Sequence, residues 1–304
     1  MNFEQIALPK KKEFKLAESI GADWKERAFS GEFKHAEMAA LTGVEVIPAE
    51  SSNPSIEIAR RVLEKNGGGN LEFKIIDVEG EPTVLITSKI GEDVFYVFCK
   101  DEFIVAKNAD DSNSKSDTGI RPYKLGIYNP NTGTTFSLDQ LINLESRSGN
   151  TIMFFEVEGK RHNQDRQITE DAGDKTQFSI INNFPFTPEE FATLLHESGH
   201  LLRNTRHVAE GVWPANKVDA RLSKSQNLID AENLSKARAT VIAEERGAST
   251  IALVFLRELQ KNGFDIASAD NLDKIQLFFE DCLKTYDKRP FVPKNVSRET
   301  QVAP

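Results

Sequence analysis

The sequence contains little of what marks several large classes of protein. Only two of its 304 residues are cysteines, Cys99 and Cys282, so we expect a reducing compartment, no disulfide framework and no cysteine-based zinc site. No apolar run approaches the roughly 18 residues that a membrane span needs, and the first residues lack the apolar segment of a secretory signal. We therefore expect a soluble protein without a membrane partner, either cytoplasmic or exported by a route without an N-terminal signal peptide.

Positive charge is also scarce relative to negative charge. The chain has 47 Asp and Glu against 38 Lys and Arg, a formal net charge of -9, and an isoelectric point near 5.3. Nucleic-acid binders depend on basic contacts with phosphates, so we expect no nucleic-acid partner. A hydrophobic share of 39% predicts a globular chain. The oligomeric state stays open.

The order of patterns along the chain predicts an α+β fold, in which helical patterns give way to strand patterns near residue 70. We expect a mostly helical or partly disordered region over 1–69, an antiparallel β-rich region over 70–165, a core over 166–290, and a polar tail over 291–304. The β-rich region contains short β-branched and aromatic runs, separated by turn-like pieces, and a further possible strand follows it. These runs are LEFKIIDV, PTVLITS, DVFYVF, EFIVAK, YKLGIY and TIMFFEVEG, and the further strand is TQFSIINNF.

Two strong helical patterns follow, over about 188–204 and 232–262, and the first contains TLLHESGHLL. Thr187 suits the N-cap, Pro188 the first helical position, and Glu190 the third position of a capping box. Because a helix has 3.6 residues per turn, His196 and His200 should project from one face, one turn apart.

This histidine pair predicts a metal site. Neutral imidazoles are good zinc ligands, and a catalytic zinc takes three protein ligands with one position left open. Glu197 lies about 100° around the helix from His196, where it could act as the general base on a water molecule without binding the metal. With five histidines in the chain, such a pattern arises by chance with a probability of roughly one per cent. The alternative is a pair of ordinary core or surface histidines beside a solvated glutamate.

The third ligand has several candidates. They are His207, Asp219, Asp230, Glu244 and Glu245. On the second helix Glu245 lies about 40° from the centre of the apolar stripe and Glu244 about 60°, so Glu245 is the more inward carboxylate and the preferred ligand. Gly199, inside the first helix, suggests a close approach of the second helix.

The capped HESGH helix and the later EERGASTIAL helix together resemble the zinc metallopeptidases of the gluzincin type. The resemblance covers about residues 175–262 and implies a zincin-like domain in which His196, His200 and Glu245 bind Zn²⁺ and Glu197 is catalytic. Many members carry an aspartate four residues after the ligand glutamate, where this chain has Ser249. The resemblance further implies that TQFSIINNF is an edge strand that pairs with substrate.

Tyrosine or histidine also stabilises the oxyanion in such enzymes, which makes Tyr286 and His207 candidates beside the alternative that both are surface residues. His35 and His162 have no partners nearby in the sequence, so we expect them to be structural or solvated.

The sequence thus predicts a hydrolase, a zinc metalloendopeptidase acting on a protein or peptide substrate. The alternatives are a catalytically inactive zincin-like binding or regulatory protein, and a structural protein in which HESGH is coincidental.

Overall fold

The computed structural model describes residues 20–45, 54–64, 71–106, 118–142, 144, 150–155, 168–172, 175–181, 184–209 and 231–288. The α-helices are α2 (Trp24–Phe29), α3 (His35–Leu41), α4 (Pro54–Glu64), α5 (Leu138–Ile142), α6 (Pro188–Ala209), α8 (Ala231–Lys261) and α9 (Ala269–Lys288), with short 3-10 helices η1 (Asp101–Phe103) and η2 (Asp265–Ala267). The strands are β1 (Leu71–Val78), β2 (Glu81–Ile90), β3 (Asp93–Lys100), β4 (Ile104–Ala106), β5 (Thr118–Ile120), β6 (Lys124–Asn129), β7 (Thr134–Ser137), β8 (Asn150–Phe155), β9 (Ile168–Ala172) and β10 (Lys175–Ile181).

The larger layer is a five-stranded antiparallel sheet with the order β1-β2-β3-β6-β7. Its first hairpin pairs Val78 with Glu81, which leaves a loop of Glu79 and Gly80 with φ angles of 60° and 86°. Two positive φ values match the twist of the flanking strands, and glycine adopts such angles without steric cost. The predicted antiparallel sheet is therefore confirmed, within an α+β fold.

A second sheet has the order β4-β5-β8-β10-β9 and is mixed, because β10 pairs with β8 in parallel and with β9 in antiparallel register. The strand predicted from TQFSIINNF is β10, and it lies between two partners. The prediction that this strand offers an open edge is wrong: strand pairing is a long-range property, and nothing in a strand's own sequence shows how many neighbours it has.

One apolar core connects the sheets with the helices. Its buried members include Trp24 from α2, Val62 from α4, Phe95 from β3, Phe191 from α6 and Phe255 from α8. Side chains from all three predicted regions between residues 1 and 290 thus pack in one cluster, and the second sheet joins β8 to β10 across residue 165. The predicted polar tail at 291–304 lies outside the described residues, as do the first 19 residues of the predicted region 1–69.

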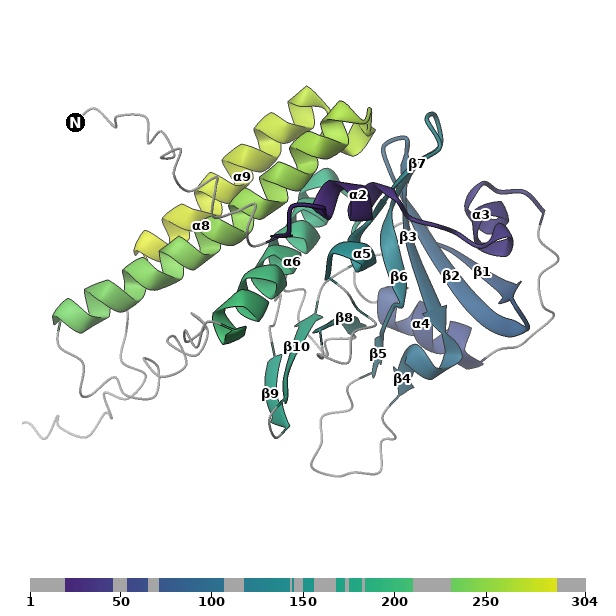
Figure 1. Ribbon diagram of the computed structural model, residues 1–304, viewed down its shortest axis with the longest axis horizontal. Coiled ribbons are helices and arrows are strands. Elements are labelled where there is room, and N and C mark those ends of the chain that lie inside the picture. The colour runs from purple at the N-terminus through teal and green to yellow at the C-terminus, as the bar shows by residue number, and fades with distance from the viewer. Residues whose placement is uncertain are drawn as a thin grey trace, which may run out of the picture.

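Three long helices, α6, α8 and α9, lie side by side next to the larger sheet (Figure 1). The turn between α8 and α9 is tied to the sheet, since Asp93 accepts a 2.8 Å hydrogen bond from the backbone of Ile266 and Asp265 accepts one from Glu92. None of the described helices has both the length and the apolar character that a bilayer span requires.

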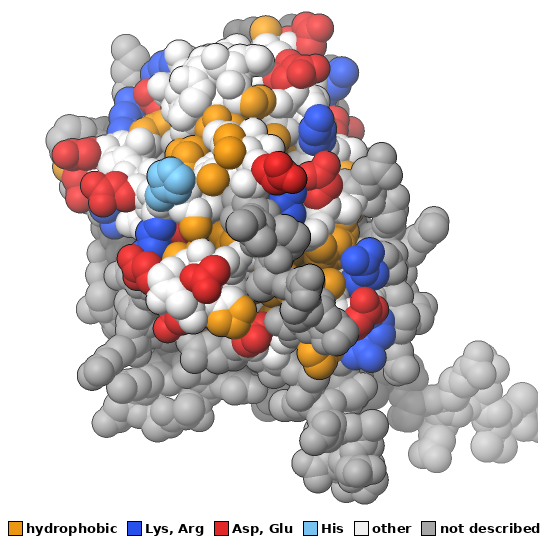
Figure 2. All heavy atoms as spheres, turned by 90° about the vertical axis from the view of Figure 1, so that its right-hand side faces the viewer, with side chains coloured by type: hydrophobic (Ala, Val, Ile, Leu, Met, Phe, Trp, Pro, Cys, Tyr) orange, Lys and Arg blue, Asp and Glu red, His pale blue; other side chains and the backbone are white. Residues whose placement is uncertain are grey.

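The side of the molecule that carries β1 and α3 presents acidic and basic side chains interspersed with apolar ones (Figure 2). The histidine pair of α6 instead belongs to the helical side, at the contact between α6 and α8.

Candidate metal centre

The start of α6 is fixed by the predicted capping box. The backbone of Glu190 donates to Oγ1 of Thr187 at 3.2 Å, and the backbone of Thr187 donates to Oε2 of Glu190 at 3.1 Å. Two of the amides that a helix start leaves unpaired are thereby satisfied. The helix then continues without interruption through His196 and His200.

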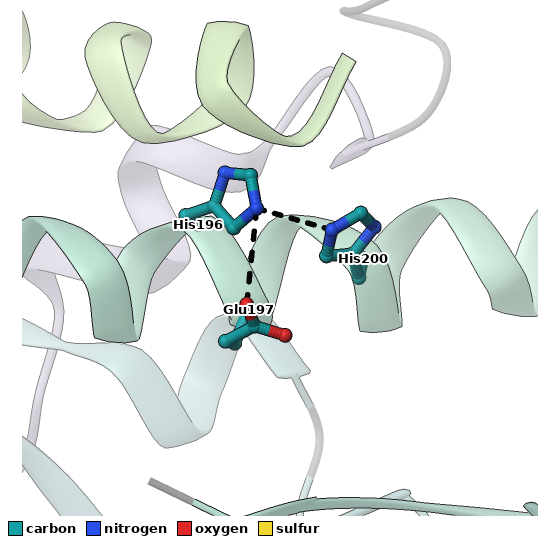
Figure 3. A group of neighbouring side chains, drawn as sticks. All are labelled: His196, Glu197 and His200. Atoms are coloured by element: carbon teal, nitrogen blue, oxygen red, sulfur yellow. Dashed lines mark hydrogen bonds and ion pairs between the residues drawn. The ribbon is translucent and has the colours of Figure 1, made fainter. Parts of the chain in front are cut away.

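His196 and His200 lie one turn apart on α6, with their rings turned toward each other (Figure 3). Their Nε2 atoms are 3.1 Å apart. From α8, Oε2 of Glu245 lies 3.2 Å from Nε2 of His196 and 3.6 Å from Nε2 of His200. The structure thus brings together three of the residues that the sequence proposed as ligands, although their donors come from two helices.

The spacing of these three atoms suits a small divalent ion. A circle through three points separated by 3.1, 3.2 and 3.6 Å has a radius of about 1.9 Å, just under the zinc–nitrogen bond length of about 2.0–2.1 Å. An ion slightly out of the plane of the three atoms could therefore contact all of them. Two imidazoles and one carboxylate are also the donor set of a hydrolytic zinc site.

Glu197 lies beside this triangle. Its Oε1 is 3.8 Å from Nε2 of His196, and Figure 3 shows it on a different side of α6 from the two rings. Together with the histidines it forms a group whose potential ligand atoms lie within 4.8 Å of one another. We nevertheless prefer Glu245 to Glu197 as the third ligand. Oε2 of Glu245 lies 3.2 and 3.6 Å from the two Nε2 atoms, whereas Oε1 of Glu197 lies 3.8 Å from Nε2 of His196.

The other nitrogen of each ring also has a partner on α8. Nδ1 of His196 is 3.1 Å from Oγ of Ser249, and Nδ1 of His200 is 3.6 Å from Oε1 of Glu244. Partners at Nδ1 fix the orientation of an imidazole and leave Nε2 facing the metal. Ser249 therefore supplies a hydroxyl partner where the resemblance led us to look for a carboxylate.

Glu244 is engaged by a guanidinium as well. Nε of Arg203 donates a 2.8 Å hydrogen bond to Oε1 of Glu244, and Nη2 donates one of 2.8 Å to Oε2. Burial alone would raise the pKa of Glu244, but interactions with His200 and Arg203 outweigh it and lower the pKa to about 2. Both oxygens of Glu244 are thus hydrogen-bonded to Arg203. Glu245 is the carboxylate that faces both Nε2 atoms.

The protonation of the metal-free site follows from these contacts. Burial alone would lower the pKa of His200, yet its interactions with Glu244 and Glu245 raise it to about 10. The same contacts with His196 and His200 hold the pKa of Glu245 well below its usual range, against the effect of burial. The contacts of His200 with the two carboxylates thus favour its protonated form while the site holds no metal.

The close approach predicted from Gly199 is confirmed. A Cβ atom at this position would lie 2.9 Å from the carbonyl oxygen of Ala248 and 3.0 Å from its Cα. Only a residue without a side chain fits between the two backbones. This contact sets the distance between α6 and α8 at the level of the donor atoms.

Sequence reasoning missed the contribution of α9. The ring of Phe279, 5% exposed, lies 5.7 Å from the ring of His196. The signal was present as apolar residues at helical spacing, Leu272, Ile275 and Phe279, which we did not interpret as a third long helix. Phe279 provides an apolar wall for the imidazole of His196.

The remaining candidates take no described part in the site. His35 is exposed at the start of α3, as expected of a solvated side chain. The side chains of His207 and Tyr286, and residues His162, Asp219 and Asp230 altogether, lie outside the described part of the chain.

Comparison with known proteins found no family model, no curated protein and no solved structure that matches the chain. The function is therefore inferred from the geometry and chemistry of the site.

Proposed function

We propose that the chain is a zinc-dependent metalloendopeptidase with a zincin-like core of the gluzincin type. The observation that supports this most is the convergence of Nε2 of His196, Nε2 of His200 and Oε2 of Glu245 at mutual distances of 3.1 to 3.6 Å. Buried histidine and carboxylate side chains are costly to desolvate, so a cluster of them is most simply explained by an ion that they share.

In this proposal His196, His200 and Glu245 hold the ion from two helices. When bound, zinc supplies Lewis acidity and lowers the pKa of a nearby water molecule toward neutrality. Glu197, whose Oε1 lies next to the ligand triangle, accepts a proton from the attacking water and then delivers it to the leaving amine. Ser249 and Glu244 keep the two imidazoles oriented through Nδ1, so that both Nε2 atoms stay available.

The test compares the wild type with Glu197→Gln. The variant should keep its zinc, since Glu197 is not a ligand, and should lose activity by roughly 10²- to 10⁴-fold, the range expected for a lost general base. Activity is measured as new peptide termini in a proteome digested with each protein, and zinc by elemental analysis. Glu189→Gln makes the same change in the first turn of α6 and should behave like the wild type.

Each outcome separates the candidate functions. If wild type and Glu197→Gln both bind zinc and are equally inert, the catalytically inactive binding or regulatory protein is favoured. A wild type that binds no zinc, or His196→Ala that binds it as tightly as wild type, would contradict the metal site itself.

A further inference from the structure

We propose that Arg203 is a positioning residue for the metal centre: its guanidinium holds Glu244 against His200, which keeps that carboxylate away from the ion and orients the imidazole. The inference rests on the proposed metal site and assigns to Arg203 a role that the ligand set alone does not require.

The first support is the geometry of the contact. Two parallel hydrogen bonds of 2.8 Å, the fork geometry that only arginine offers, occupy both oxygens of Glu244. Oε1 of that carboxylate also lies 3.6 Å from Nδ1 of His200. Arg203 on α6, Glu244 on α8 and His200 on α6 thus form a chain that crosses the helix contact twice.

A second, independent support comes from Gly247 on α8. A Cβ atom added at this position would overlap the guanidinium of Arg203. Glycine is a poor residue for the interior of a helix, so its presence is explained by the space that Arg203 requires. The absence of a side chain at Gly247 therefore provides the space in which the guanidinium of Arg203 lies.

The consequence is that the two adjacent glutamates have different roles. Glu245 is free to face both Nε2 atoms, whereas Glu244 is held back and acts on His200 through Nδ1 only. Loss of Arg203 should release Glu244 from its place beside Nδ1 and thereby loosen the orientation of His200.

The experiment measures zinc affinity by competition with a chromophoric chelator for Arg203→Met, Arg203→Lys and Gly247→Ala. Arg203→Met should weaken binding by about 10- to 100-fold, the range for lost partners of metal ligands, and Arg203→Lys should restore part of it because an ammonium group can still donate a hydrogen bond to Glu244. Gly247→Ala should also weaken binding by about 10-fold, since the added methyl group displaces the guanidinium. Arg257→Met makes the same substitution at an exposed site on α8 and should leave affinity unchanged.

Denaturant unfolding of each metal-free variant separates positioning from folding. Alanine is the better helix former, so Gly247→Ala with weaker zinc binding but intact folding supports positioning. If Arg203→Met fails to fold, Gly247→Ala and Arg203→Lys still decide the question. Zinc binding equal to that of the wild type in the folded variants would overturn this inference alone. A wild type without zinc affinity would overturn the proposed function and this inference with it.

Discussion

The five-stranded sheet and the contact between α6 and α8 bury different kinds of side chain. The sheet buries apolar groups such as Ile86, Phe95 and Leu125, each 0% exposed. At the helix contact the buried groups include His200, Glu244 and Ser249, which are 9%, 6% and 6% exposed.

Apolar burial stabilises the fold directly, whereas burial of ionisable groups costs free energy unless they are paired. The helix contact reduces that cost through a network of mutual contacts, and the network leaves an arrangement of donors that fits an ion. The comparison teaches that the sheet supplies stability, whereas the helix contact gives up part of that stability to hold ionisable groups together.

The largest expected effect is on the sheet side. Phe95 is fully buried, and its ring lies 5.0 Å from that of Phe184 and 5.9 Å from that of Phe191 on α6. Phe95→Ala should lower the free energy of unfolding by about 3–5 kcal/mol, because it removes a large apolar group and leaves a cavity. Urea unfolding measures this loss.

The exposed control is Leu277→Ala, at a side chain 62% exposed, which should change stability by under about 0.5 kcal/mol. If Phe95→Ala cost no more than this control, the contrast between an apolar stabilising sheet and a polar helix contact would not hold.

A second effect sharpens the comparison, because the sheet side also buries ionisable groups, among them Asp139 and Asp93. Asp139 on α5 accepts a 3.0 Å hydrogen bond from the backbone of Leu125 in β6, and burial raises its pKa from 3.8 to about 6. The folded state therefore keeps the proton over a pH range in which the unfolded chain has lost it. Stability from this group is fully present below about pH 4, falls as pH rises to about 6, and is constant above, by about 3 kcal/mol in total.

Asp139→Asn should remove this share of the pH dependence, as measured by urea unfolding between pH 4 and pH 7. Burial raises the pKa of Asp93 to about 6 as well, so part of the slope should persist in the variant. A difference between wild type and variant that is independent of pH would show that Asp139 is already ionised across this range in the folded state.

The smallest expected effect is at the helix contact. Ser249→Ala removes the hydroxyl 3.1 Å from Nδ1 of His196 and should weaken zinc binding by about 10-fold, or about 1.4 kcal/mol. Chelator competition measures the change, and Thr250→Ala removes a neighbouring hydroxyl that bonds only to the backbone of Arg246 in the described contacts. Equal zinc affinity in the two variants would show that the hydroxyl of Ser249 does not support zinc binding by His196.

Much of the local structure could be predicted from the sequence. The cap at Thr187, the start of α6 and the extent of α8, Ala231–Lys261, follow from local signals, and LEFKIIDV matches β1. The end of α6 does not, since the helix continues to Ala209 beyond the predicted end near residue 204. Helical periodicity favours Glu245 as the more inward carboxylate, but Glu244 is the more buried of the two, with its side chain 8% exposed against 18% for Glu245. What distinguishes Glu245 is that its Oε2 faces both Nε2 atoms, which depends on the packing of α8 against α6.

What could not be predicted depends on distant parts of the chain. The position of β10 inside the second sheet depends on β8 and β9, and the place of Phe279 beside His196 depends on how α9 packs. Nothing in the sequence around Arg203 indicates a role for it. Its pairing with Glu244 becomes visible only once α6 and α8 are side by side.

The contact of Gly199 with the backbone of Ala248 has a consequence for ion selectivity. Because main chain meets main chain there, the backbones of α6 and α8 are held at a fixed, short separation at the level of the donor residues. Calcium takes six to eight oxygen ligands at about 2.3–2.6 Å and would need a wider, more oxygen-rich enclosure. We therefore expect the protein to discriminate among cations by radius, through a glycine that contributes no donor atom.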